Sequence, residues 1–545
     1  MNLNKRYLIY LALIILISLT FKLYTVDFSI PVTSDAVEYA LLAVAYSNGQ
    51  FLQHPQYNSG WPLLISSFFL AVNSENFLDY SNVMRILGLG ISTITILLVY
   101  LVSRKFFNEK LSIMAAIIFA FEPRLNQISG LGVSEPLFIL IMISSFYFIL
   151  NTNTRYLFVS FILAGILWWV RPNGFMMFFA LSIIYFINFR KTKNFVRTYV
   201  FYVLLLLLIV SPMLLQRYDQ FGNPTYNWIA EKIWVGDYAQ SISVNIQSAD
   251  YTALDFINDN GILSFFNKFV LAGLYNLLYI TARMTFPYLF VLLPFGIFLS
   301  FKMVFRDNNI RALWITILVT IVSMIVSFSV IPDKRLMFFL FPFLSIFATL
   351  PIKKLIEHKS DKIFSINIKN ILLVIVGVSV IIVSALYTSY YERPDSILEK
   401  EKLEFTTYMV YDIKAKVLFD PSDLQNYFGH PLIFSDPSYF KKIRINENWE
   451  NGKPVFNYPE ETHNRIMIHG KSMEDLISNG EKYGLTHIMT TKDGGSFFSF
   501  VDELYSEEKK YAYLKKVFDS NEQRFTKLNL KVFEIDYGKF HQLFG

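Results

Sequence analysis

The segment Leu131–Leu150 reads LGVSEPLFILIMISSFYFIL, and its only charged side chain is Glu135, near its start. A helix of about 20 mostly apolar residues is long enough to cross the hydrocarbon core of a bilayer. A helix on the surface of a soluble protein keeps a polar face toward water, and this segment has none. The segment therefore predicts a membrane-spanning helix.

Ten more runs of this kind lie before and after it, and several of them are short. We therefore predict a multi-pass α-helical membrane protein with about eleven transmembrane helices. The predicted spans are Tyr7–Leu23, Met84–Val102, Leu111–Phe121, Leu131–Leu150, Tyr156–Val170, Phe175–Phe189, Tyr199–Leu215, Phe286–Phe301, Ala312–Ile331, Met337–Leu350 and Ile371–Tyr387. A shorter apolar run, Trp61–Val72, predicts an interfacial or re-entrant piece, because about twelve residues are too few to cross.

The composition agrees with this class and excludes others. Of the 545 residues, 54% are apolar and 17% are charged, against about 25% charged in a typical soluble protein. The chain has no cysteine, which excludes disulfide scaffolds, cysteine-ligated metal centres and thiol nucleophiles. The seven histidines show no metal-ligand spacing, and no phosphate-binding loop, GxSxG or dinucleotide motif is present. Nothing in the charge pattern indicates nucleic-acid binding.

The charge density changes near residue 389 and predicts a domain boundary there. Residues 389–545 carry 21 basic and 25 acidic side chains, whereas residues 1–388 carry 28 and 18 in more than twice the length. We expect a transmembrane domain over 1–388, with long external loops at about 25–83 and 216–285. A soluble α/β domain is expected over 389–545, with strands at Ala415–Phe419, His487–Thr491, Tyr513–Phe518 and Leu530–Tyr537 and a helix at Ser472–Tyr483.

Lysine and arginine gather in alternate connections, and residues 25–84 contain neither. Short cytoplasmic loops of membrane proteins carry an excess of these residues. The alternation predicts a cytoplasmic N-terminus, a first span retained as a signal anchor, and an extracytoplasmic C-terminal domain. The plasma membrane is the expected location. The basic connections are Lys5/Arg6, Arg104/Lys105/Lys110, Arg155, 190–197, Lys302/Arg306/Arg311 and 353–369.

Ionisable side chains on the predicted external face are the candidates for chemistry, because charges near a membrane are costly. Asp35 and Glu38 follow the first span in Thr33-Ser34-Asp35-Ala36-Val37-Glu38. In one interpretation they begin an ordinary helix capped by Ser34 or Asp35. In the other, Asp35 is a general base.

Two further external segments allow two interpretations each. Glu135 begins the fourth span, where Ser134 would cap the helix and Glu135 would offset its dipole, or where Glu135 would meet substrate. The external loop before it also contains Arg124. Arg171, in Arg171-Pro172-Asn173-Gly174, either snorkels or binds a phosphate.

Lys334 and Arg335 form a cationic pair on the side that otherwise lacks basic residues, in Ile331-Pro332-Asp333-Lys334-Arg335. The pair either is balanced by Asp333 or binds an anion.

The ordered set of these motifs over roughly residues 1–190 resembles the GT-C class of membrane glycosyltransferases. The similarity is greatest to the branch of dolichyl-phosphate-mannose protein mannosyltransferases and lipid A aminoarabinose transferases. The motifs are Ser34-Asp35-Ala36-Val37-Glu38-Tyr39-Ala40, His54-Pro55, Gly60-Trp61-Pro62-Leu63-Leu64, Met84-Arg85-Ile86-Leu87, Ser134-Glu135-Pro136-Leu137-Phe138 and Arg171-Pro172-Asn173-Gly174. In relatives the last turn often has an acid where Asn173 stands, and the first loop often has two adjacent acids.

The resemblance implies a hexosyl- or pentosyltransferase that uses a polyprenyl-phosphate sugar and inverts the anomeric centre. By position, Asp35 matches the catalytic base and Glu135 the acid of the second external loop. We expect substrate to be bound by Glu38, His54, Arg124, Glu135, Arg171, Lys334 and Arg335. A divalent metal, Mg or Mn, would be held by Asp35 and Glu135 if one takes part. The acceptor, whether protein, lipid or glycan, stays open.

Two other functional classes are compatible with the residues. A transporter or flippase of lipid-linked glycans would require ionisable groups at mid-bilayer and interrupted helices. The predicted spans contain few charges, although Pro212 and Pro294 lie within them. A catalytically inactive membrane scaffold is the other alternative.

Overall fold

The computed structural model describes residues 5–72, 74–151, 153–246, 251–357, 366–418, 424–428, 433–434, 446–450, 453–457, 464–522 and 525–545. Lys359 and Lys362, which belong to a predicted cytoplasmic loop, lie outside these ranges. Phe419, the end of the first predicted strand, and the histidines His358, His430 and His463 also lie outside them.

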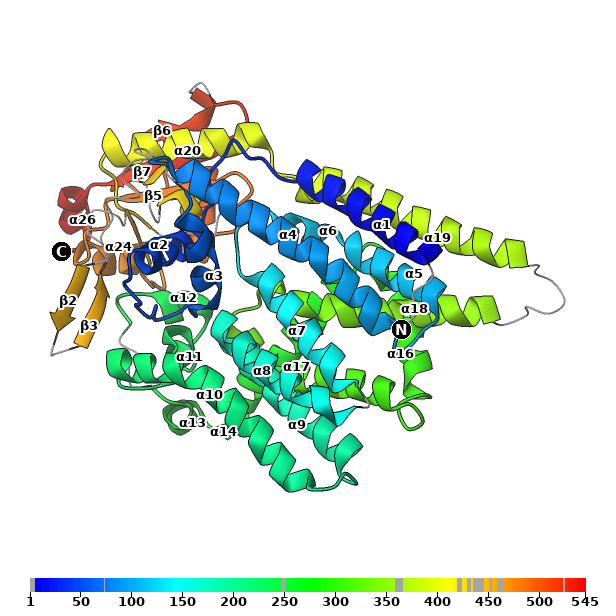
Figure 1. Cartoon of the computed structure of the whole chain (residues 1–545). Helices are drawn as coiled ribbons and strands as arrows, with labels where there is room; N and C mark the ends of the chain where they lie inside the picture. Colours follow the sequence, from blue (N-terminus) through cyan, green and yellow to red (C-terminus); the bar gives the residue numbers. More distant parts are fainter. Residues whose placement is uncertain are drawn as a thin grey trace.

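The chain is a mostly helical membrane protein (Figure 1). In the described residues, eight helical segments are long and apolar enough to cross a membrane. They are Lys5–Tyr24 (α1), Phe77–Ser103 (α4), Pro172–Phe189 (η2 and α9), Phe195–Phe221 (α10), Ile262–Met284 (α14, η3 and α15), Asn308–Val330 (α17), Lys334–Glu357 (η4 and α18) and Lys369–Tyr411 (most of α19, which begins at Ile366, with η5 and α20).

The other helices are shorter. Four of the predicted spans are helices of 12 to 15 residues: Glu109–Ala120 (α5), Glu135–Ile149 (α7), Leu157–Val170 (α8) and Leu289–Phe301 (α16). The predicted interfacial piece is a ten-residue helix, Gly60–Phe69 (α3). The remaining short helices outside the C-terminal region are Asp35–Ser47 (α2), Pro123–Ser129 (α6), Trp228–Lys232 (α11), Tyr238–Ile242 (α12) and Ala253–Asn260 (α13).

The number of spans and the stretch 216–285 differ from the simplest interpretation of the sequence. Because the four short helices fall below the usual span length, the count of eleven stays a prediction. The stretch 216–285, predicted as a loop, is largely helical, and Ile262–Met284 is apolar enough to be among the eight candidate segments. Its tyrosines, asparagines and lysine lower the mean hydropathy of this segment to 1.3, which explains why no apolar run stands out there.

Small and polar side chains bring the membrane helices together. Ser145 on α7 and Ser160 on α8 exchange hydrogen bonds of 2.6–3.2 Å with each other's hydroxyl and carbonyl oxygens. Gly296 on α16 has the backbone of α18 where a Cβ would be, so only glycine allows this approach. Large apolar side chains on the outer faces stay exposed, such as Leu16 on α1 and Phe298 on α16, as expected of surfaces that meet lipid.

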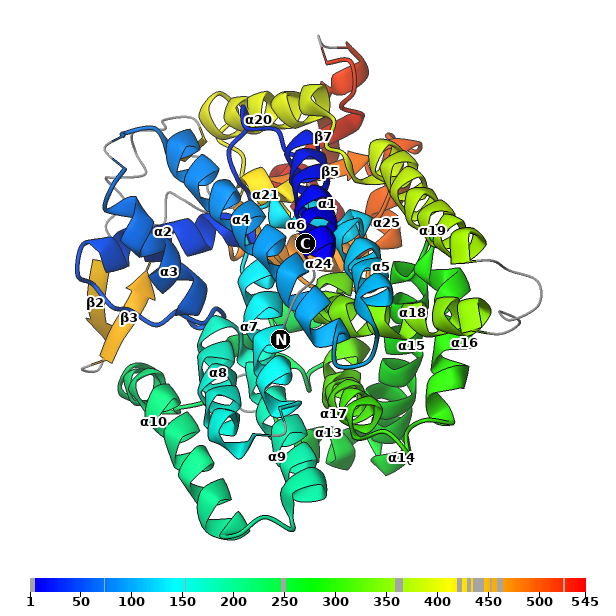
Figure 2. The same cartoon turned by 45° about the vertical axis from the view of Figure 1, so that its right-hand side comes forward.

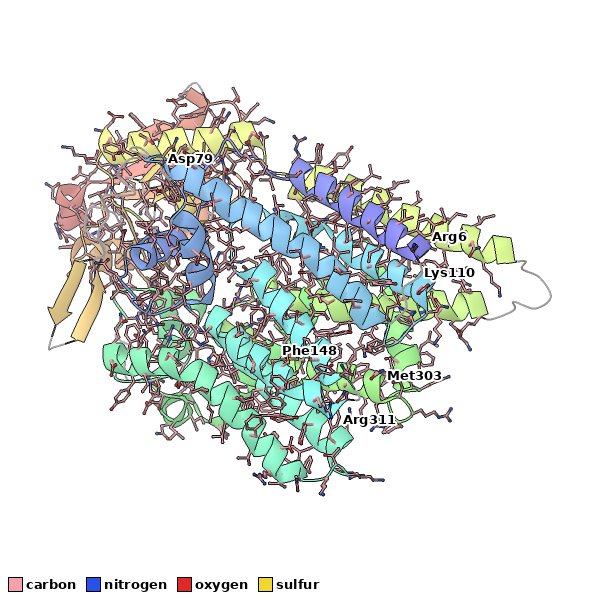
Figure 3. The ribbon with its side chains drawn as sticks, viewed as in Figure 1. Arg6, Asp79, Lys110, Phe148, Met303 and Arg311 are labelled. Atoms are coloured by element: carbon pink, nitrogen blue, oxygen red, sulfur yellow. The ribbon has the colours of Figure 1, made fainter. Side chains whose placement is uncertain are left out.

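The helical body has two different ends. Arg6, Lys110 and Arg311 lie at the end away from the C-terminal region, whereas Asp79 lies at the end beside it (Figure 3). The helices α2, α3, α11 and α12 also gather at this second end (Figure 1), and α2 and α3 lie beside β2 and β3 in Figure 2 as well. Basic residues that are far apart in sequence therefore share one end of the helical body.

The C-terminal region contains a mixed five-stranded sheet with the order β4-β1-β5-β7-β6. The strands are Val417–Leu418 (β1), Arg465–Ile466 (β4), His487–Thr491 (β5), Leu514–Asp519 (β6) and Leu530–Ile535 (β7), and Asn446–Glu450 (β2) pairs separately with Lys453–Asn457 (β3). Strand β1 runs parallel to β4 and β5, and β7 runs antiparallel to β5 and β6. The helices are Ser396–Tyr411 (α20), Gln425–Phe428 (α21), Met473–Glu481 (α24), Ser499–Asp502 (α25) and Tyr537–Phe544 (α26).

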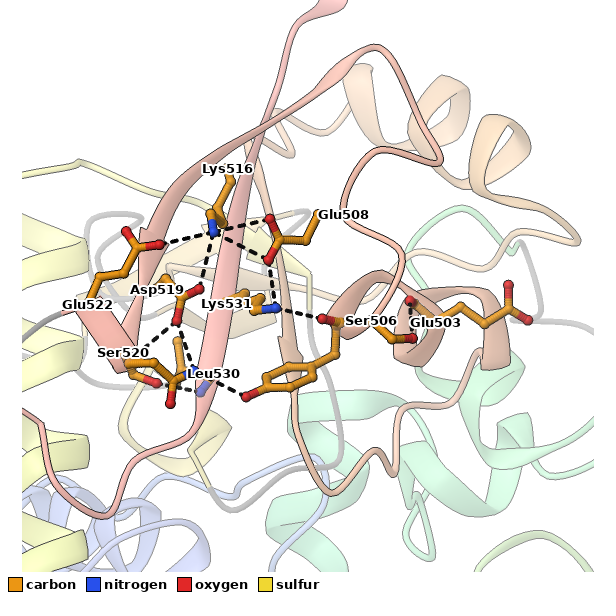
Figure 4. Close-up of polar contacts among 11 residues, drawn as sticks. Glu503, Ser506, Glu508, Lys516, Asp519, Ser520, Glu522, Leu530 and Lys531 are labelled. Atoms are coloured by element: carbon orange, nitrogen blue, oxygen red, sulfur yellow. Dashed lines mark hydrogen bonds and ion pairs between the residues drawn. The ribbon is translucent and has the colours of Figure 1, made fainter.

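An ion-pair network ties the last two strands to the preceding loop (Figure 4). Lys516 on β6 lies 3.1–3.3 Å from the carboxylates of Glu508, Asp519 and Glu522, and Lys531 on β7 lies 2.6 Å from Glu508. Charge networks of this kind contribute more to stability than isolated surface pairs. The β6–β7 edge of the sheet is therefore held in a defined arrangement.

Candidate functional site

A cavity of about 1000 Å³ opens where the second end of the helical body meets the C-terminal region. Its wall comes from several parts of the chain that are far apart in sequence. The segment between α1 and α2 contributes Asp27, and the first residue of α2 contributes Asp35. The turn before η4 contributes Asp333, η4 itself contributes Arg335, and the C-terminal region contributes Arg465. Aromatic side chains complete the wall, among them Tyr57, Trp228, Tyr238, Tyr427 and Phe497.

Asp35 is the carboxylate at the centre of the polar contacts in this cavity. Its Oδ2 accepts a hydrogen bond from Arg335 Nη1 at 2.8 Å, and its Oδ1 accepts one from the Tyr57 hydroxyl at 2.9 Å. The same Arg335 donates from Nε to Asp333 Oδ2 at 2.8 Å. One guanidinium thus holds two carboxylates, and Asp35 remains about one-quarter exposed toward the cavity.

The backbone just before Asp35 is strained. Ser34 has a φ of 56°, a conformation that side-chain-bearing residues rarely adopt. Such strain persists at functional sites when neighbouring structure imposes it. The expectation that Ser34 caps α2 through its side chain is wrong, because in this conformation its hydroxyl does not reach the backbone N–H groups of the first turn.

Tyr57 is presented by a loop that α10 and α11 hold from behind. Arg217 on α10 is buried and donates to the carbonyl oxygens of His54 and Tyr57 at 3.2 and 3.1 Å and to Asn58 Oδ1 at 3.0 Å. Trp228, at the start of α11, donates its backbone N–H to the carbonyl of Pro55 at 3.1 Å. These bonds fix the loop so that the Tyr57 hydroxyl points at Asp35.

The charges around Asp35 keep it ionised. Burial on its own would raise the pKa of the Asp35 carboxyl, but the Arg335 guanidinium and the Tyr57 hydroxyl outweigh burial and hold that pKa below its ordinary value. Burial and the neighbouring Asp35 carboxylate raise the pKa of Tyr57 well above that of a free tyrosine. Tyr57 therefore keeps its proton and remains the donor of this hydrogen bond.

A second ion pair lies next to Asp35 but does not line the main cavity. Arg171 Nη1 is 2.6 Å from Glu135 Oε1, and the Glu135 side chain is only 5% exposed. The expected cap of α7 by the Ser134 side chain is wrong, because the Ser134 hydroxyl instead lies 3.2 Å from the Tyr39 hydroxyl. Glu135 and Arg171 border a very small cavity of about 10 Å³ together with Arg335, so the two pairs share one electrostatic environment.

The other predicted site residues lie at different depths. The His54 ring packs in a tilted arrangement against that of Tyr57, with centroids 4.7 Å apart, and His54 Nε2 is 3.9 Å from Glu38 Oε2. Neither His54 nor Glu38 lies on the cavity wall. Lys334 begins η4 and does not line the cavity.

Arg124 lies elsewhere. It is buried against Glu122, the backbone carbonyls of Met284 and Phe286, and the Tyr387 hydroxyl, at 2.6 to 3.1 Å. The structure does not bring it to the cavity.

The donor set does not fit a divalent metal. Asp35 and Glu135, the two carboxylates predicted to hold one, are each paired with an arginine. Among the residues that the structure describes, no three His, Asp or Glu side chains gather at one point.

Several residues of the wall lie outside the sequence motifs that predict the site. Tyr57 lies three residues after His54, between Gln56 and Asn58, and none of the quoted motifs includes it. Arg465, Trp228 and Tyr238 belong to segments far from the motifs in sequence, so no local pattern identifies them.

Comparisons with known proteins support a GT-C-like organisation. Residues 62–215 match the family described as dolichyl-phosphate-mannose-protein mannosyltransferase. A comparison with curated proteins found no significant match.

The structure is similar to that of the oligosaccharyltransferase of Archaeoglobus fulgidus. The apo form matches with a TM-score of 0.56 and 13% identity, over 89% of this chain and 70% of that one. The same enzyme with an inhibitory peptide and a dolichol-phosphate matches with a TM-score of 0.54 and 13% identity, over 89% and 69%. With a tethered acceptor peptide the values are 0.55 and 13%, over 95% and 74%. The resemblance to GT-C membrane glycosyltransferases is thus confirmed, and at this identity the structural match concerns the fold.

Proposed function

We propose that this protein is an integral-membrane glycosyltransferase that moves a sugar from a polyprenyl phosphate to an acceptor hydroxyl, with Asp35 as general base. The observation that carries the proposal is Asp35 itself. It is an ionised carboxylate, held between Arg335 and Tyr57, that faces a cavity of about 1000 Å³. The family match over residues 62–215 and the fold shared with an enzyme solved with dolichol-phosphate support this class of donor.

The reaction follows from these groups. The acceptor oxygen attacks the anomeric carbon while its proton passes to a carboxylate oxygen of Asp35. The bond from that carbon to the phosphate oxygen breaks, and the polyprenyl phosphate leaves with the electron pair. Attack from the side opposite the leaving group inverts the anomeric centre. Positive charge near the leaving phosphate stabilises the negative charge that develops on it.

The proposed topology places this chemistry outside the cytoplasm. Arg6, Lys110 and Arg311 share the end of the helical body opposite the cavity (Figure 3), which supports a cytoplasmic N-terminus by the excess of basic residues in cytoplasmic loops. The proposal includes eleven spans in the plasma membrane and an extracytoplasmic α/β domain over 389–545. One additional crossing before Lys302 would place the basic connection after it on the opposite side, so we place Ile262–Met284 along the outer face rather than across the bilayer.

The proposal is tested by sugar transfer in membranes that contain the full-length chain. Polyprenyl phosphates carrying radiolabelled hexoses or pentoses are supplied as donors, and label is followed into protein, lipid and glycan fractions. We expect transfer from at least one donor, with the labelled fraction identifying the acceptor class. Movement of an intact labelled lipid across the membrane without transfer would contradict the proposal and favour a transporter or flippase.

A further inference from the structure

The ion pair of Glu135 and Arg171 takes no part in the reaction proposed above, and neither residue lines the main cavity. Arg171 Nη1 is 2.6 Å from Glu135 Oε1, and the Glu135 side chain is 5% exposed. Its other oxygen, Oε2, is buried and has no hydrogen-bond partner among the described residues. A buried carboxylate is costly unless a counter-charge compensates it. The charge of Glu135 is therefore compensated by Arg171.

This pair lies next to the pair that holds the proposed base. Glu135, Arg171 and Arg335 border one cavity of about 10 Å³, a volume that holds about one water molecule. Arg335 in turn donates to Asp35 at 2.8 Å. The side chains of Arg171 and Arg335 are therefore near neighbours, and the space between them is too small for a sugar or a phosphate.

The turn that carries Arg171 is closed against the end of α8. The backbone N–H of Arg171 donates to the carbonyl of Leu167 at 3.2 Å, and the N–H of Gly174 donates to the carbonyl of Arg171 at 2.9 Å. At Gly174 the backbone of Leu167 lies where a Cβ would be. The position of the Arg171 backbone is thus fixed, and the partner of its side chain is what a substitution can change.

Glu135 is also tied to the helix that begins with Asp35. The hydroxyl of Ser134, the residue before Glu135, lies 3.2 Å from the Tyr39 hydroxyl. Tyr39 is buried and follows Asp35 by four residues on α2, which is about one helical turn. This contact between α2 and α7 fixes the two carboxylates, Asp35 and Glu135, relative to each other.

Asp35 needs a free acceptor position to act as a base. A carboxylate has about four such positions, and Arg335 and Tyr57 occupy one on each oxygen of Asp35. A second guanidinium on Asp35 would compete with the acceptor hydroxyl and weaken the base. Arg171 is the candidate for this competition, because its charge already acts on Asp35. The structure prevents it by pairing Arg171 with Glu135.

We propose that Glu135 is a positioning residue, which holds Arg171 and so keeps Asp35 open to the acceptor hydroxyl. The inference rests on the proposed function, in which Asp35 is the general base. Without the charge of Glu135, Arg171 lacks a counter-charge in a mostly enclosed site and turns to Asp35. Proton transfer from the acceptor then slows. This role differs from the sequence-based interpretation that Glu135 meets substrate, because it acts through Arg171.

A double-variant cycle on the purified full-length chain tests this role, with undecaprenyl phosphates that carry a radiolabelled hexose or pentose as donors. Glu135→Gln removes the charge and keeps the size of the side chain, and Glu135→Asp keeps the charge. The double variant Glu135→Gln/Arg171→Gln removes both charges. Two controls remove a charge elsewhere: Glu109→Gln, whose carboxylate lies 3.8 Å from Arg104 at the start of α5, and Lys471→Gln, an exposed cation that does not line the cavity. Rates are compared per amount of folded chain, measured by gel filtration in detergent.

The two neutralising variants should differ in the direction that a charge effect predicts. In Glu135→Gln, kcat should fall about 10- to 100-fold, which is part of what a general base contributes. The double variant should return to within about threefold of the wild type, because no uncompensated cation remains beside Asp35. Glu135→Asp should lie between Glu135→Gln and the wild type, and both controls should keep the wild-type kcat.

The outcomes separate this inference from the proposed function. If the wild-type chain transfers sugar from none of these donors, the proposed function is contradicted, and the role of Glu135 with it. If the wild type transfers sugar and Glu135→Gln keeps its kcat, the positioning role alone is refuted. A double variant as slow as Glu135→Gln would also refute it and would favour direct contact of the pair with substrate. If Glu135→Gln is not recovered as a folded chain, the double variant decides: recovery to within about threefold of the wild type supports the role, and a greater loss refutes it.

Discussion

Replacement of Arg335 by glutamine should slow sugar transfer and change its pH dependence. In the wild type, one guanidinium and two carboxylates, Asp35 and Asp333, give this group a net charge of −1. In Arg335→Gln the charge becomes −2, in a cavity that must receive a phosphate. Loss of one such charge-stabilising donor typically costs about 10²- to 10³-fold in rate, and we expect a loss of that size here.

The pH dependence gives a separate and more specific readout. Arg335 helps to hold the pKa of Asp35 below its ordinary value, and a general base acts only while it is ionised. The wild type therefore keeps its activity as the pH falls, until the pH approaches that lowered pKa. Without Arg335 the pKa of Asp35 rises, so the acid limb of kcat/KM should move to higher pH.

The assay is initial-rate transfer by purified enzyme over a series of pH values, with Arg335→Lys and Lys471→Gln measured in parallel. Arg335→Lys keeps the charge but not the forked geometry, and it should fall between Arg335→Gln and the wild type. A wild-type rate in Arg335→Gln, or an acid limb that does not move, would refute the assignment of Arg335 as the partner of the catalytic base.

Three further variants test the surroundings of Asp35. Tyr57→Phe removes the 2.9 Å hydrogen bond to Asp35 and should lower kcat about tenfold, with the acid limb at higher pH; an unchanged profile would contradict this. Glu135→Ala leaves Arg171 without its buried partner at 2.6 Å and should destabilise the protein by about 3 kcal/mol, seen as a lower unfolding temperature in detergent. Gly174→Ala would place a Cβ against the backbone at the end of α8 and should cost about 1–3 kcal/mol. In that variant the turn that carries Arg171 is displaced, so retained stability would argue against the packing described.

The sequence predicts the helical elements well where the hydrophobic signal is long. The runs Tyr7–Leu23 and Ala312–Ile331 correspond to α1 and α17. In the C-terminal region, His487–Thr491 is β5 as predicted. The segment Ile262–Met284 gives no long apolar run, because asparagine, lysine, tyrosine and arginine side chains interrupt it. In the structure its helix packs against α17.

The candidate site was predicted in part. Asp35 stands out in the sequence as an ionisable side chain on the predicted external face, and Arg335 as a cation on the side that otherwise lacks basic residues. The two lie 300 positions apart in sequence, and the structure joins them at 2.8 Å. Arg124 was singled out by the same reasoning, but it binds backbone carbonyls near Met284. A sequence does not reveal which partner a charged side chain finds, because that partner is set by tertiary packing. Arg465 had no signal for the same reason.

The central claim is that the Asp35 carboxylate carries the transfer. It is tested most directly by comparing Asp35→Asn with Asp27→Asn, another aspartate on the wall of the same cavity, in the radiolabelled transfer assay. The asparagine keeps the size of the side chain and removes its capacity to take a proton. We predict that Asp35→Asn is inserted normally and transfers no sugar above background, while Asp27→Asn retains activity. Transfer by Asp35→Asn at the wild-type rate would contradict the account.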